Sequence, residues 1–417
     1  MSPFHLAGGE LHAEGVPLEA IAARFGTPCY VYSRHAIESA YQALERALAG
    51  LPHLICYAVK ANSNLAVLDV LARAGAGFDI VSGGELARVQ AAGGKPQNIV
   101  FSGVGKSEAE MEAALAAGIL CFNVESAAEL RVLDAVAGRM GRVAPVSLRV
   151  NPDVDPKTHP YIATGLKDSK FGVAIAEAPA LYRHAAGLRN LAVRGVDCHI
   201  GSQITDLSVC AEAAEKMFAL ADRIEADGLP LEHVDLGGGL GIRYRDEEAI
   251  PFADYANVVR AARGTRRHRL LFEPGRVLVA DAGILLTRVT YLKSGGSRDF
   301  AIVDAAMNDL IRPALYEAWH PVAAARPREG VARRWQLVGP ICESADFLAH
   351  DRELALAEGD LLAIGGAGAY GFVMSSNYNS RPRACEVLVD GKSLHLARRR
   401  ESIDELFAHE NPLPRSA

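Results

Sequence analysis

Residues 54–84 read LICYAVKANSNLAVLDVLARAGAGFDIVSGG, and this stretch combines two patterns. Residues 54–59 and 78–81 form short apolar runs without helical period, which is typical of buried parallel strands. Between them, residues 65–74 have apolar side chains three or four positions apart, as an amphipathic helix does. The stretch therefore predicts a strand–helix–strand unit, with Lys60 directly after the first strand.

The same alternation continues to residue 275. Further apolar runs lie at residues 99–102, 120–124, 146–150, 193–200, 233–236 and 270–273. Helical patterns separate most of them, at residues 84–92, 107–117, 127–136, 210–226 and 252–262. Eight strands with helical crossovers favour an α/β fold with a closed (β/α)8, TIM-like barrel. An open doubly wound sheet is the alternative, and the number of strands alone does not exclude it.

After residue 280 the pattern changes to strand-like segments separated by turn residues, at 283–291, 300–303, 335–338, 361–364 and 385–389. This pattern predicts a mostly β C-terminal domain. The early strand-like piece at residues 29–32 is expected to join it. The predicted domains are therefore a barrel at residues 35–280 and a β-rich domain made of residues 1–34 and 281–417.

Composition restricts the function classes. The net charge of −6 argues against nucleic acid as a partner, because phosphate binding needs a basic face. The odd number of cysteines, seven, and the absence of a CxxC pair disfavour a disulfide framework and a structural zinc site. A reducing, cytoplasmic location fits best. We expect no secretory signal, no membrane span and no metal.

Polar residues collect after the predicted strands, where a barrel carries its active site. Lys60 follows the first strand, His199 lies one residue inside the predicted end of the sixth, and Glu273 ends the eighth. A lysine beside an apolar strand is costly to bury unless it is paired or used covalently, and a desolvated amine can form a Schiff base. The alternative is a lysine that extends to solvent.

The glycine-rich segment 237–241 and the tetrapeptide Glu273-Pro274-Gly275-Arg276 could bind a phosphate through amide and guanidinium donors. A plain tight turn is the alternative for the glycines. Glu273 could keep a pyridine nitrogen protonated, or form an internal ion pair with an arginine. His199 could stack on an aromatic ring, or be a hydrogen-bonded structural histidine.

The C-terminal part offers further candidates. A thiol such as Cys342 is mostly protonated at neutral pH and could donate a proton to a carbanion. Glu343 could bind a substrate ammonium group, and Arg312 with Tyr316 could bind a carboxylate. Tyr370 lies among glycines that could expose its hydroxyl group. A buried apolar cysteine, a surface ion pair and a half-buried aromatic are the respective alternatives.

Taken together, these residues resemble a known family over nearly the whole chain. The matching segments are FGTP at residue 25, YAVKAN at 57, SGGE at 82, NVES at 123, THPY at 158, KFG at 170, HIGSQ at 199, GGGLG at 237, EPGR at 273, MND at 307, CES at 342 and SNYNSRPR at 376. The chain is similar to diaminopimelate decarboxylases, fold-type-III pyridoxal-phosphate enzymes related to ornithine decarboxylase and alanine racemase. Small differences, such as Ala345, lie outside the matched positions.

The resemblance implies a role for each matched residue. Lys60 would carry pyridoxal 5'-phosphate as a Schiff base, with Asp79 nearby, His199 stacked on the ring and Glu273 at the ring nitrogen. Cys342 would be catalytic with Lys60. The residues around the cofactor phosphate would be Ser202, Gly239, Gly275, Arg276 and Tyr370. The residues that bind the substrate would be Arg276, Arg312, Tyr316, Glu343 and Tyr370.

The resemblance also implies a reaction and an assembly. The chain would decarboxylate meso-2,6-diaminopimelate to L-lysine and carbon dioxide, the last step of lysine biosynthesis. It would act as a homodimer with shared active sites, in which the loop carrying Cys342 reaches the barrel of the partner. Decarboxylation of ornithine or arginine is the nearest alternative. A racemase, which pairs the ring nitrogen with arginine, and a non-catalytic cofactor carrier are the others.

Overall fold

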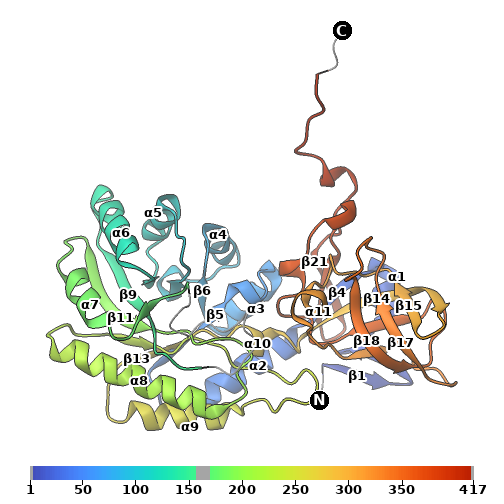
Figure 1. The fold of residues 1–417 in the computed structure, drawn as a ribbon, viewed down its shortest axis with the longest axis horizontal. Helices are drawn as coiled ribbons and strands as arrows, with labels where there is room; N and C mark the ends of the chain where they lie inside the picture. The colour runs from blue at the N-terminus through green and yellow to red at the C-terminus, as the bar shows by residue number, and fades with distance from the viewer. Residues whose placement is uncertain (1–2, 156–169, 415–417) are drawn as a thin grey trace. The chain divides into compact units, whose positions relative to one another are not determined.

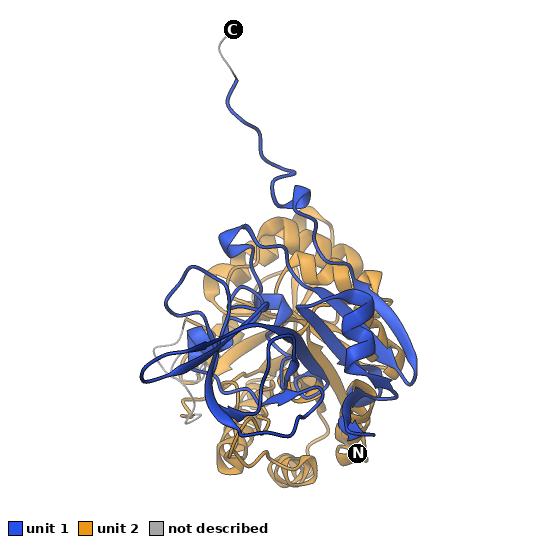
Figure 2. Ribbon diagram, turned by 90° about the vertical axis from the view of Figure 1, so that its right-hand side faces the viewer, with its two compact units in different colours: residues 1–36, 279–417 blue, residues 37–278 orange. Residues whose placement is uncertain are grey.

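The computed structural model describes residues 3–155 and 170–414. The chain divides into two compact units, one of residues 37–278 and one of residues 1–36 and 279–417, which are coloured separately in Figure 2. The second unit combines both ends of the chain, so its sheets join residues that are far apart in the sequence.

The first unit is a closed barrel of eight parallel strands that follow one another in chain order. Each strand pairs with the next, and the last pairs with the first through Leu270–His53, Leu271–Leu54 and Phe272–Ile55. This closure confirms the barrel and excludes the open sheet. The strands are β5 (His53–Ala58), β6 (Gly77–Ile80), β7 (Ile99–Phe101), β8 (Cys121–Val124), β9 (Ala144–Asn151), β11 (Leu191–Asp197), β12 (His233–Asp235) and β13 (Arg269–Phe272), with a short β10 (Val173–Ala174) beside β9.

Helices lie outside the ring of strands (Figure 1). Side-chain caps fix where several begin: Ser82 and Ser126 each accept a hydrogen bond from a backbone N–H three residues on, and Ser107 forms a capping box with Glu110. The helices are α2 (Arg34–Ala47), α3 (Leu65–Ala74), α4 (Gly83–Ala91), α5 (Glu108–Ala117), α6 (Ala127–Arg139), α7 (Ala178–Ala186), α8 (Leu207–Ala226), α9 (Phe252–Arg263) and α10 (Arg276–Val279), with the 3-10 turns η1 (Val59–Ala61) and η2 (Pro96–Asn98).

The strands are buried on both faces, which explains why they appear in the sequence as continuous apolar runs. Leu54, Val100 and Leu271 pack in one cluster with two cysteines, Cys56 and Cys121, none of which reaches the surface appreciably. These two cysteines are therefore small core residues. All seven cysteines are free thiols.

The second unit is mostly β, as predicted. In its larger sheet β4 (Cys29–Ser33) lies between β14 (Gly283–Ser294) and β20 (Cys385–Asp390), which confirms that the early strand joins the C-terminal ones. The other strands of this sheet are β15 (Asp299–Val303), β16 (Val322–Ala324), β17 (Arg333–Val338), β18 (Phe347–Leu354), β19 (Leu361–Ile364) and β21 (Ser393–Arg398). A separate sheet of β1 (Phe4–Ala7), β2 (Glu10–Ala13) and β3 (Val16–Pro17) precedes α1 (Leu18–Phe25), and the remaining helical pieces are α11 (Arg312–Tyr316), η4 (Phe372–Met374), η5 (Tyr378–Ser380) and η6 (Asp404–Leu406).

The structure corrects several sequence-based boundaries. The sixth barrel strand, expected at residues 193–200, ends at Asp197, so His199 lies two residues beyond the strand rather than inside it. The reason is that β11 pairs with β12 only as far as Asp197 and Asp235, after which both segments leave the ladder. The helices α2 and α7 and the strands β18 and β21 were not predicted. In the part of the chain that the structure describes, no helix is long and apolar enough to span a membrane.

Candidate active site

Lys60 lies in the turn η1 at the carboxyl end of β5. Its Nζ donates a hydrogen bond to Oδ2 of Asp79 at 2.7 Å. The Asp79 side chain is fully buried on β6, whereas that of Lys60 is 32% exposed. The paired carboxylate offsets the cost of holding an ammonium group at this edge of the barrel, and the exposure leaves the amine accessible.

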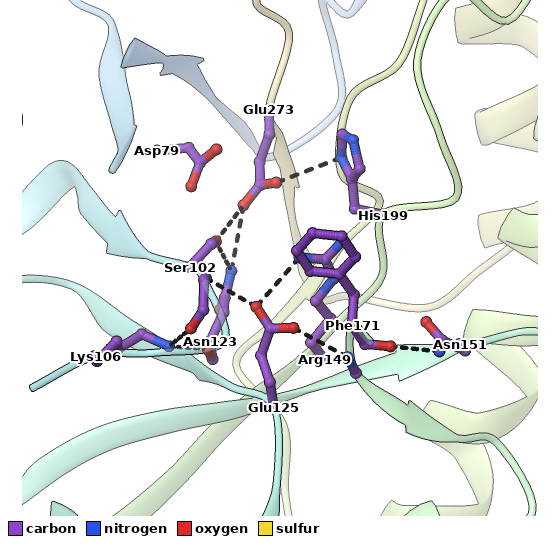
Figure 3. A network of polar contacts seen from close by, with 12 residues as sticks. Asp79, Ser102, Lys106, Asn123, Glu125, Arg149, Asn151, Phe171, His199 and Glu273 are labelled. Atoms are coloured by element: carbon purple, nitrogen blue, oxygen red, sulfur yellow. Dashed lines mark hydrogen bonds and ion pairs between the residues drawn. The ribbon is translucent and has the colours of Figure 1, made fainter. Parts of the chain in front are cut away.

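Glu273 follows β13 and points into a polar network (Figure 3). Its Oε1 accepts hydrogen bonds from Ser102 Oγ at 3.3 Å and from Asn123 Nδ2 at 3.2 Å. Asn123 Nδ2 also donates to Ser102 Oγ, and the side-chain oxygen Oδ1 of Asn123 accepts a hydrogen bond from Ser147 Oγ at 2.6 Å. These neutral donors come from β8, β9 and the end of β7, so the barrel itself positions the carboxyl group.

His199 lies on the other side of Glu273, with Nδ1 3.8 Å from Oε2 (Figure 3). The same Nδ1 accepts a hydrogen bond from the backbone N–H of Gly238 at 3.2 Å, which assigns this nitrogen as the acceptor of the ring. Burial, and then the positive charges of Lys60 and Arg149, lower the pKa of His199 well below its usual value. The imidazole is therefore neutral at neutral pH.

The carboxyl group of Glu273 has the opposite tendency. Burial, and then the negative charges of Asp79 and Asp235, raise its pKa well above the usual range. Within the described residues it forms no salt bridge with a lysine or an arginine, because Lys60 pairs with Asp79 and Arg149 pairs with Glu125. A buried carboxyl group with neutral donors and no cationic partner is suited to a cation that a ligand brings, such as a protonated ring nitrogen.

Two buried ion pairs support the rim of the barrel next to this network. Arg149 Nη1 on β9 lies 3.2 Å from Glu125 Oε1, and the Arg149 guanidinium lies 4.7 Å from the centre of the Phe171 ring. Lys106 Nζ lies 2.7 Å from Glu129 Oε1. Figure 3 shows Arg149, Phe171 and Lys106 around the part of the network that contains Ser102, Asn123 and Glu125. The sequence analysis gave none of these residues a role.

Two of the residues expected around a phosphate group, Arg276 and Ser202, are in contact in the barrel unit. Arg276 Nη2 donates to Ser202 Oγ at 3.0 Å, and its Nη1 donates to the Tyr244 hydroxyl group at 2.8 Å. Gly239 has φ +101°, and a side chain there would meet the Gly201 carbonyl oxygen at 2.3 Å, so this position requires glycine. Arg276 and Ser202 together provide charged and neutral donors, which fits a phosphate group.

The residues present therefore fit pyridoxal phosphate at three points. An accessible amine, Lys60, can react with its aldehyde, and Glu273 can face its ring nitrogen. Arg276 and Ser202 can bind its phosphate. The neutral imidazole of His199 adjoins Glu273 and could stack on the ring of the cofactor.

Gly275 precedes α10 in the barrel unit, and the remaining five predicted site residues belong to the second unit. Arg312 begins α11 and is buried, Tyr316 ends it, and Tyr370 follows β19 with φ +56°. Cys342 and Glu343 lie between β17 and β18, and both are exposed. The backbone N–H of Cys342 donates to Asn379 Oδ1 at 2.7 Å, which anchors this loop. The exposed thiol argues against the alternative of a buried core cysteine. The roles of these five residues stay predictions.

Several residues of the site were missed from the sequence. Ser102, Asn123 and Asp197 lie in or directly after β7, β8 and β11, and Asp235 ends β12. A search for polar residues at every predicted strand end would have found Ser102, Asn123 and Asp235, because these ends meet at one face of a barrel. Asp197 lay inside the predicted sixth strand, which in the structure ends at this residue. The Thr158–Tyr161 motif lies outside the described residues.

Comparison with known proteins agrees with this geometry. Residues 34–280 match the family described as the pyridoxal binding domain of pyridoxal-dependent decarboxylases. The diaminopimelate decarboxylase of Pseudomonas aeruginosa is 62% identical over 414 residues, which cover 99% of this chain and 100% of that one.

Two solved structures extend the comparison. The diaminopimelate decarboxylase of Helicobacter pylori complexed with L-lysine is 43% identical, with a TM-score of 0.92 over 94% of this chain and 99% of that one. The M. jannaschii enzyme in co-complex with L-lysine is 37% identical, with a TM-score of 0.94 over 98% of both chains. The chain thus belongs to the diaminopimelate decarboxylase family of pyridoxal-dependent decarboxylases.

Proposed function

We propose that this protein decarboxylates meso-2,6-diaminopimelate to L-lysine and carbon dioxide, with pyridoxal 5'-phosphate as cofactor. The observation that carries the proposal is the accessible Lys60 amine, 2.7 Å from Asp79, on the barrel edge that also holds Glu273. Relatives that are 50% to 62% identical over nearly the full length are diaminopimelate decarboxylases, which supports this substrate. The product places the enzyme at the last step of lysine biosynthesis.

The functional division of the chain is a cofactor-binding barrel at residues 35–280 and a β-rich domain of residues 1–34 and 281–417. In the barrel, Lys60 attaches the cofactor and Asp79 holds the amine in position. Ser202, Gly239, Gly275 and Arg276 surround the phosphate, with Tyr370 from the β-rich domain. Bound pyridoxal phosphate supplies the electron sink for the carbanion that remains when carbon dioxide leaves.

The barrel residues tune this site electrostatically. Glu273 would face the ring nitrogen of the bound cofactor and hold its proton, while Ser102 and Asn123 provide hydrogen bonds to the ionised form of Glu273. His199 would adjoin the ring as a neutral imidazole, so it adds no positive charge that would compete with Lys60. Orientation and charge are thus fixed before the substrate binds.

The β-rich domain supplies the substrate contacts. Arg312 and Tyr316, together with Arg276 of the barrel, bind substrate carboxylates, and Glu343 binds an ammonium group. Cys342 donates a proton to the α-carbon after decarboxylation. These roles rest on the residue types, on the exposure of Cys342 and on the family resemblance.

The assembly that fits these roles is a homodimer in which the loop around Cys342 completes the barrel site of the partner. We infer a cytoplasmic location from seven free thiols, which suit a reducing compartment. The sharing of sites can be tested by mixing two inactive variants, Lys60→Ala and Cys342→Ala. Activity of the mixture above the sum of the separate variants supports shared sites, and no gain contradicts them.

A second basic amino acid, ornithine or arginine, is the alternative substrate. Diaminopimelate differs from both by a second amino-acid group at the far end, and Arg312 and Tyr316 offer the donors that its distal carboxylate needs. A racemase is disfavoured by Glu273, because that group of enzymes pairs the ring nitrogen with arginine.

The decisive experiment is a substrate panel with product identification. The purified, cofactor-loaded chain is incubated separately with meso-diaminopimelate, ornithine, arginine and lysine, and released carbon dioxide and amine products are identified by mass spectrometry. We expect lysine and carbon dioxide from meso-diaminopimelate. Release of putrescine or agmatine without lysine would show that ornithine or arginine, rather than diaminopimelate, is the substrate.

The Cys342→Ala variant distinguishes an enzyme from a cofactor carrier. Loss of the proton donor is expected to lower kcat by about 10²-fold while cofactor binding is retained. A carrier would retain all of its function, measured as cofactor affinity and release rate. A matched control is Cys210→Ala, which removes a buried thiol on α8 of the barrel.

A further inference from the structure

Three carboxyl groups meet inside the barrel at the ends of neighbouring strands. Asp197 ends β11, Asp235 ends β12 in direct register with it, and Glu273 follows β13. One carboxylate oxygen from each residue lies within 4.8 Å of one oxygen from each of the other two. The three residues are 1%, 0% and 2% exposed, so water does not screen them from each other.

The charged groups around this carboxyl cluster, defined as Asp197, Asp235 and Glu273, do not neutralise it. Among the described residues, Lys60 and Arg149 are the cations whose charges act on the cluster, and each is paired with another carboxylate, Asp79 and Glu125 respectively. His199 is kept neutral, as described above. Burial also raises the pKa of the thiols of Cys56 and Cys198 well above the usual range, so both are neutral.

Hydrogen bonding in the carboxyl cluster is uneven. Neither carboxylate oxygen of Asp197 has a partner among the described residues. Asp235 accepts one hydrogen bond at Oδ1, from the Gly237 backbone N–H at 2.9 Å, and its Oδ2 has none. Glu273 accepts from Ser102 and Asn123. Three buried carboxylates at this spacing cannot all be ionised, and the one without donors is the hardest to ionise.

We propose that the carboxyl cluster stores protons for the cofactor: Asp197 stays protonated, and Asp235 shares with Glu273 the proton that Glu273 passes to the ring nitrogen. This inference rests on the proposed function, because it assumes that pyridoxal phosphate binds above Glu273. Asp197 and Asp235 are then positioning residues, which act through Glu273 rather than touching the substrate. The sequence analysis gave neither of them a role.

The proton balance of the transfer is simple. Before the cofactor binds, a proton on the Glu273 carboxyl group can be hydrogen-bonded to Asp235. When the ring nitrogen accepts this proton, Glu273 becomes a carboxylate that faces a cation and accepts from Ser102 and Asn123. No electron transfer and no further reactant are required. Asp197 remains neutral and adds no repulsion to the new carboxylate.

The electrostatics of the two aspartates agree with this arrangement. Burial, and then the charge of Asp235, raise the pKa of Asp197 well above its usual value. Burial is also the main cause that raises the pKa of Asp235 to about 7. The hydrogen bond from the Gly237 backbone N–H acts in the opposite direction and lowers this pKa. At neutral pH the carboxyl cluster therefore retains protons that exposed aspartates would have lost.

Infrared difference spectroscopy of the full-length chain tests the proposal without an activity assay. Protonated carboxyl groups give a C=O stretching band that carboxylates lack and that shifts in deuterium oxide. At neutral pH we expect this band in the wild type without cofactor. One component of the band should be missing in Asp197→Asn, and a different component should be missing in Glu273→Gln. Addition of pyridoxal phosphate should remove from the wild type the component that Glu273→Gln lacks.

Two further variants make the test specific. Asp235→Asn removes a negative charge beside Glu273, so the Glu273 component should titrate about one pH unit lower than in the wild type. The control Glu232→Gln changes a carboxylate whose side chain is 60% exposed and should leave the band unchanged. Circular dichroism verifies folding, and the wild-type band with and without cofactor tests the proposal even where a variant does not fold.

The proposal is overturned if the wild type shows no protonated-carboxyl band at neutral pH. It is also overturned if Asp197→Asn and Glu273→Gln both leave the band intact, or if cofactor binding does not change it. Failure of the decarboxylase function gives a different result, namely the expected band without lysine among the reaction products.

Discussion

Two lysines on the same edge of the barrel show how differently one residue type can be used. Lys60 follows β5 and Lys106 follows β7, and each has its Nζ 2.7 Å from a carboxylate oxygen, of Asp79 and Glu129 respectively. The Lys60 side chain is 32% exposed, whereas that of Lys106 is 1% exposed. Lys106 also donates to the carbonyl oxygens of Gly103 and Asn123, at 2.8 and 2.7 Å.

The difference lies in what each ammonium group is free to do. An ammonium group has three donors, and Lys106 uses all of them on fixed acceptors in a region closed to solvent. It fastens the loop after β7 to α6, which is a structural task. Lys60 combines a buried partner with an accessible amine, so it can react with a ligand. A buried ion pair alone is thus no evidence that a lysine takes part in a reaction. The distinguishing feature of Lys60 is that its paired amine is accessible to a ligand.

The largest effect is expected from Lys60→Ala. Decarboxylation should fall by at least about 10³-fold, because the covalent attachment of the cofactor is lost. Mass spectrometry of borohydride-reduced protein should show a pyridoxyl group on the peptide that contains Lys60 in the wild type and none in the variant. A pyridoxyl group found on another lysine would contradict the assignment of Lys60 as the reactive lysine.

Lys106→Met should have a smaller effect, on stability. The change leaves Glu129 without its cation in a buried site, which should cost about 3 kcal/mol in the free energy of unfolding. Urea unfolding of the full chain measures it, and the pyridoxyl group on Lys60 should remain. The control Lys216→Met breaks the exposed pair with Glu212 and should change stability by less than about 0.5 kcal/mol. Equal losses in the two variants would refute the structural role.

The smallest effect concerns the pH dependence of the Lys60 region. Burial is the main cause that raises the pKa of Glu85, which lies in the first turn of α4, from 4.5 to about 7, and the charge of Asp79 adds to it. The folded chain therefore binds this proton more tightly than the unfolded chain does. The tighter binding of this proton contributes stability that is fully present below pH 4.5 and is lost as the pH rises through 7.

Glu85→Gln should remove this pH-dependent loss of stability. Between pH 4.5 and pH 7 the free energy of unfolding of the variant should therefore fall by about 2 kcal/mol less than that of the wild type. Urea unfolding at several pH values measures the difference. Glu110→Gln is the opposite control, because backbone N–H donors of Gly83 and Ser107 lower the pKa of Glu110. Its contribution to stability is present at higher pH and is lost as the pH falls. Identical pH profiles for Glu85→Gln and the wild type would contradict the assignment.

Much of the fold and part of the candidate site could be predicted from the sequence. Strand boundaries came within a few residues, because a buried parallel strand leaves a continuous apolar run. The error at His199 arose since residues 198–200 remain apolar in part after the ladder with β12 has ended. The strands β18 and β21 were missed because most of their residues are exposed or only half-buried and give no such run.

What the sequence by itself determined was the alternation of strands and helices and the residue types at the strand ends, since both depend on local periodicity and on the order of the chain. Only the tertiary structure decided that the barrel closes, because this needs residues 270–272 to pair with residues 53–55. It also decided which lysine is accessible and that Asp197, Asp235 and Glu273 share one buried space. Exposure and charge coupling depend on neighbours that are remote in sequence, and local patterns do not specify them.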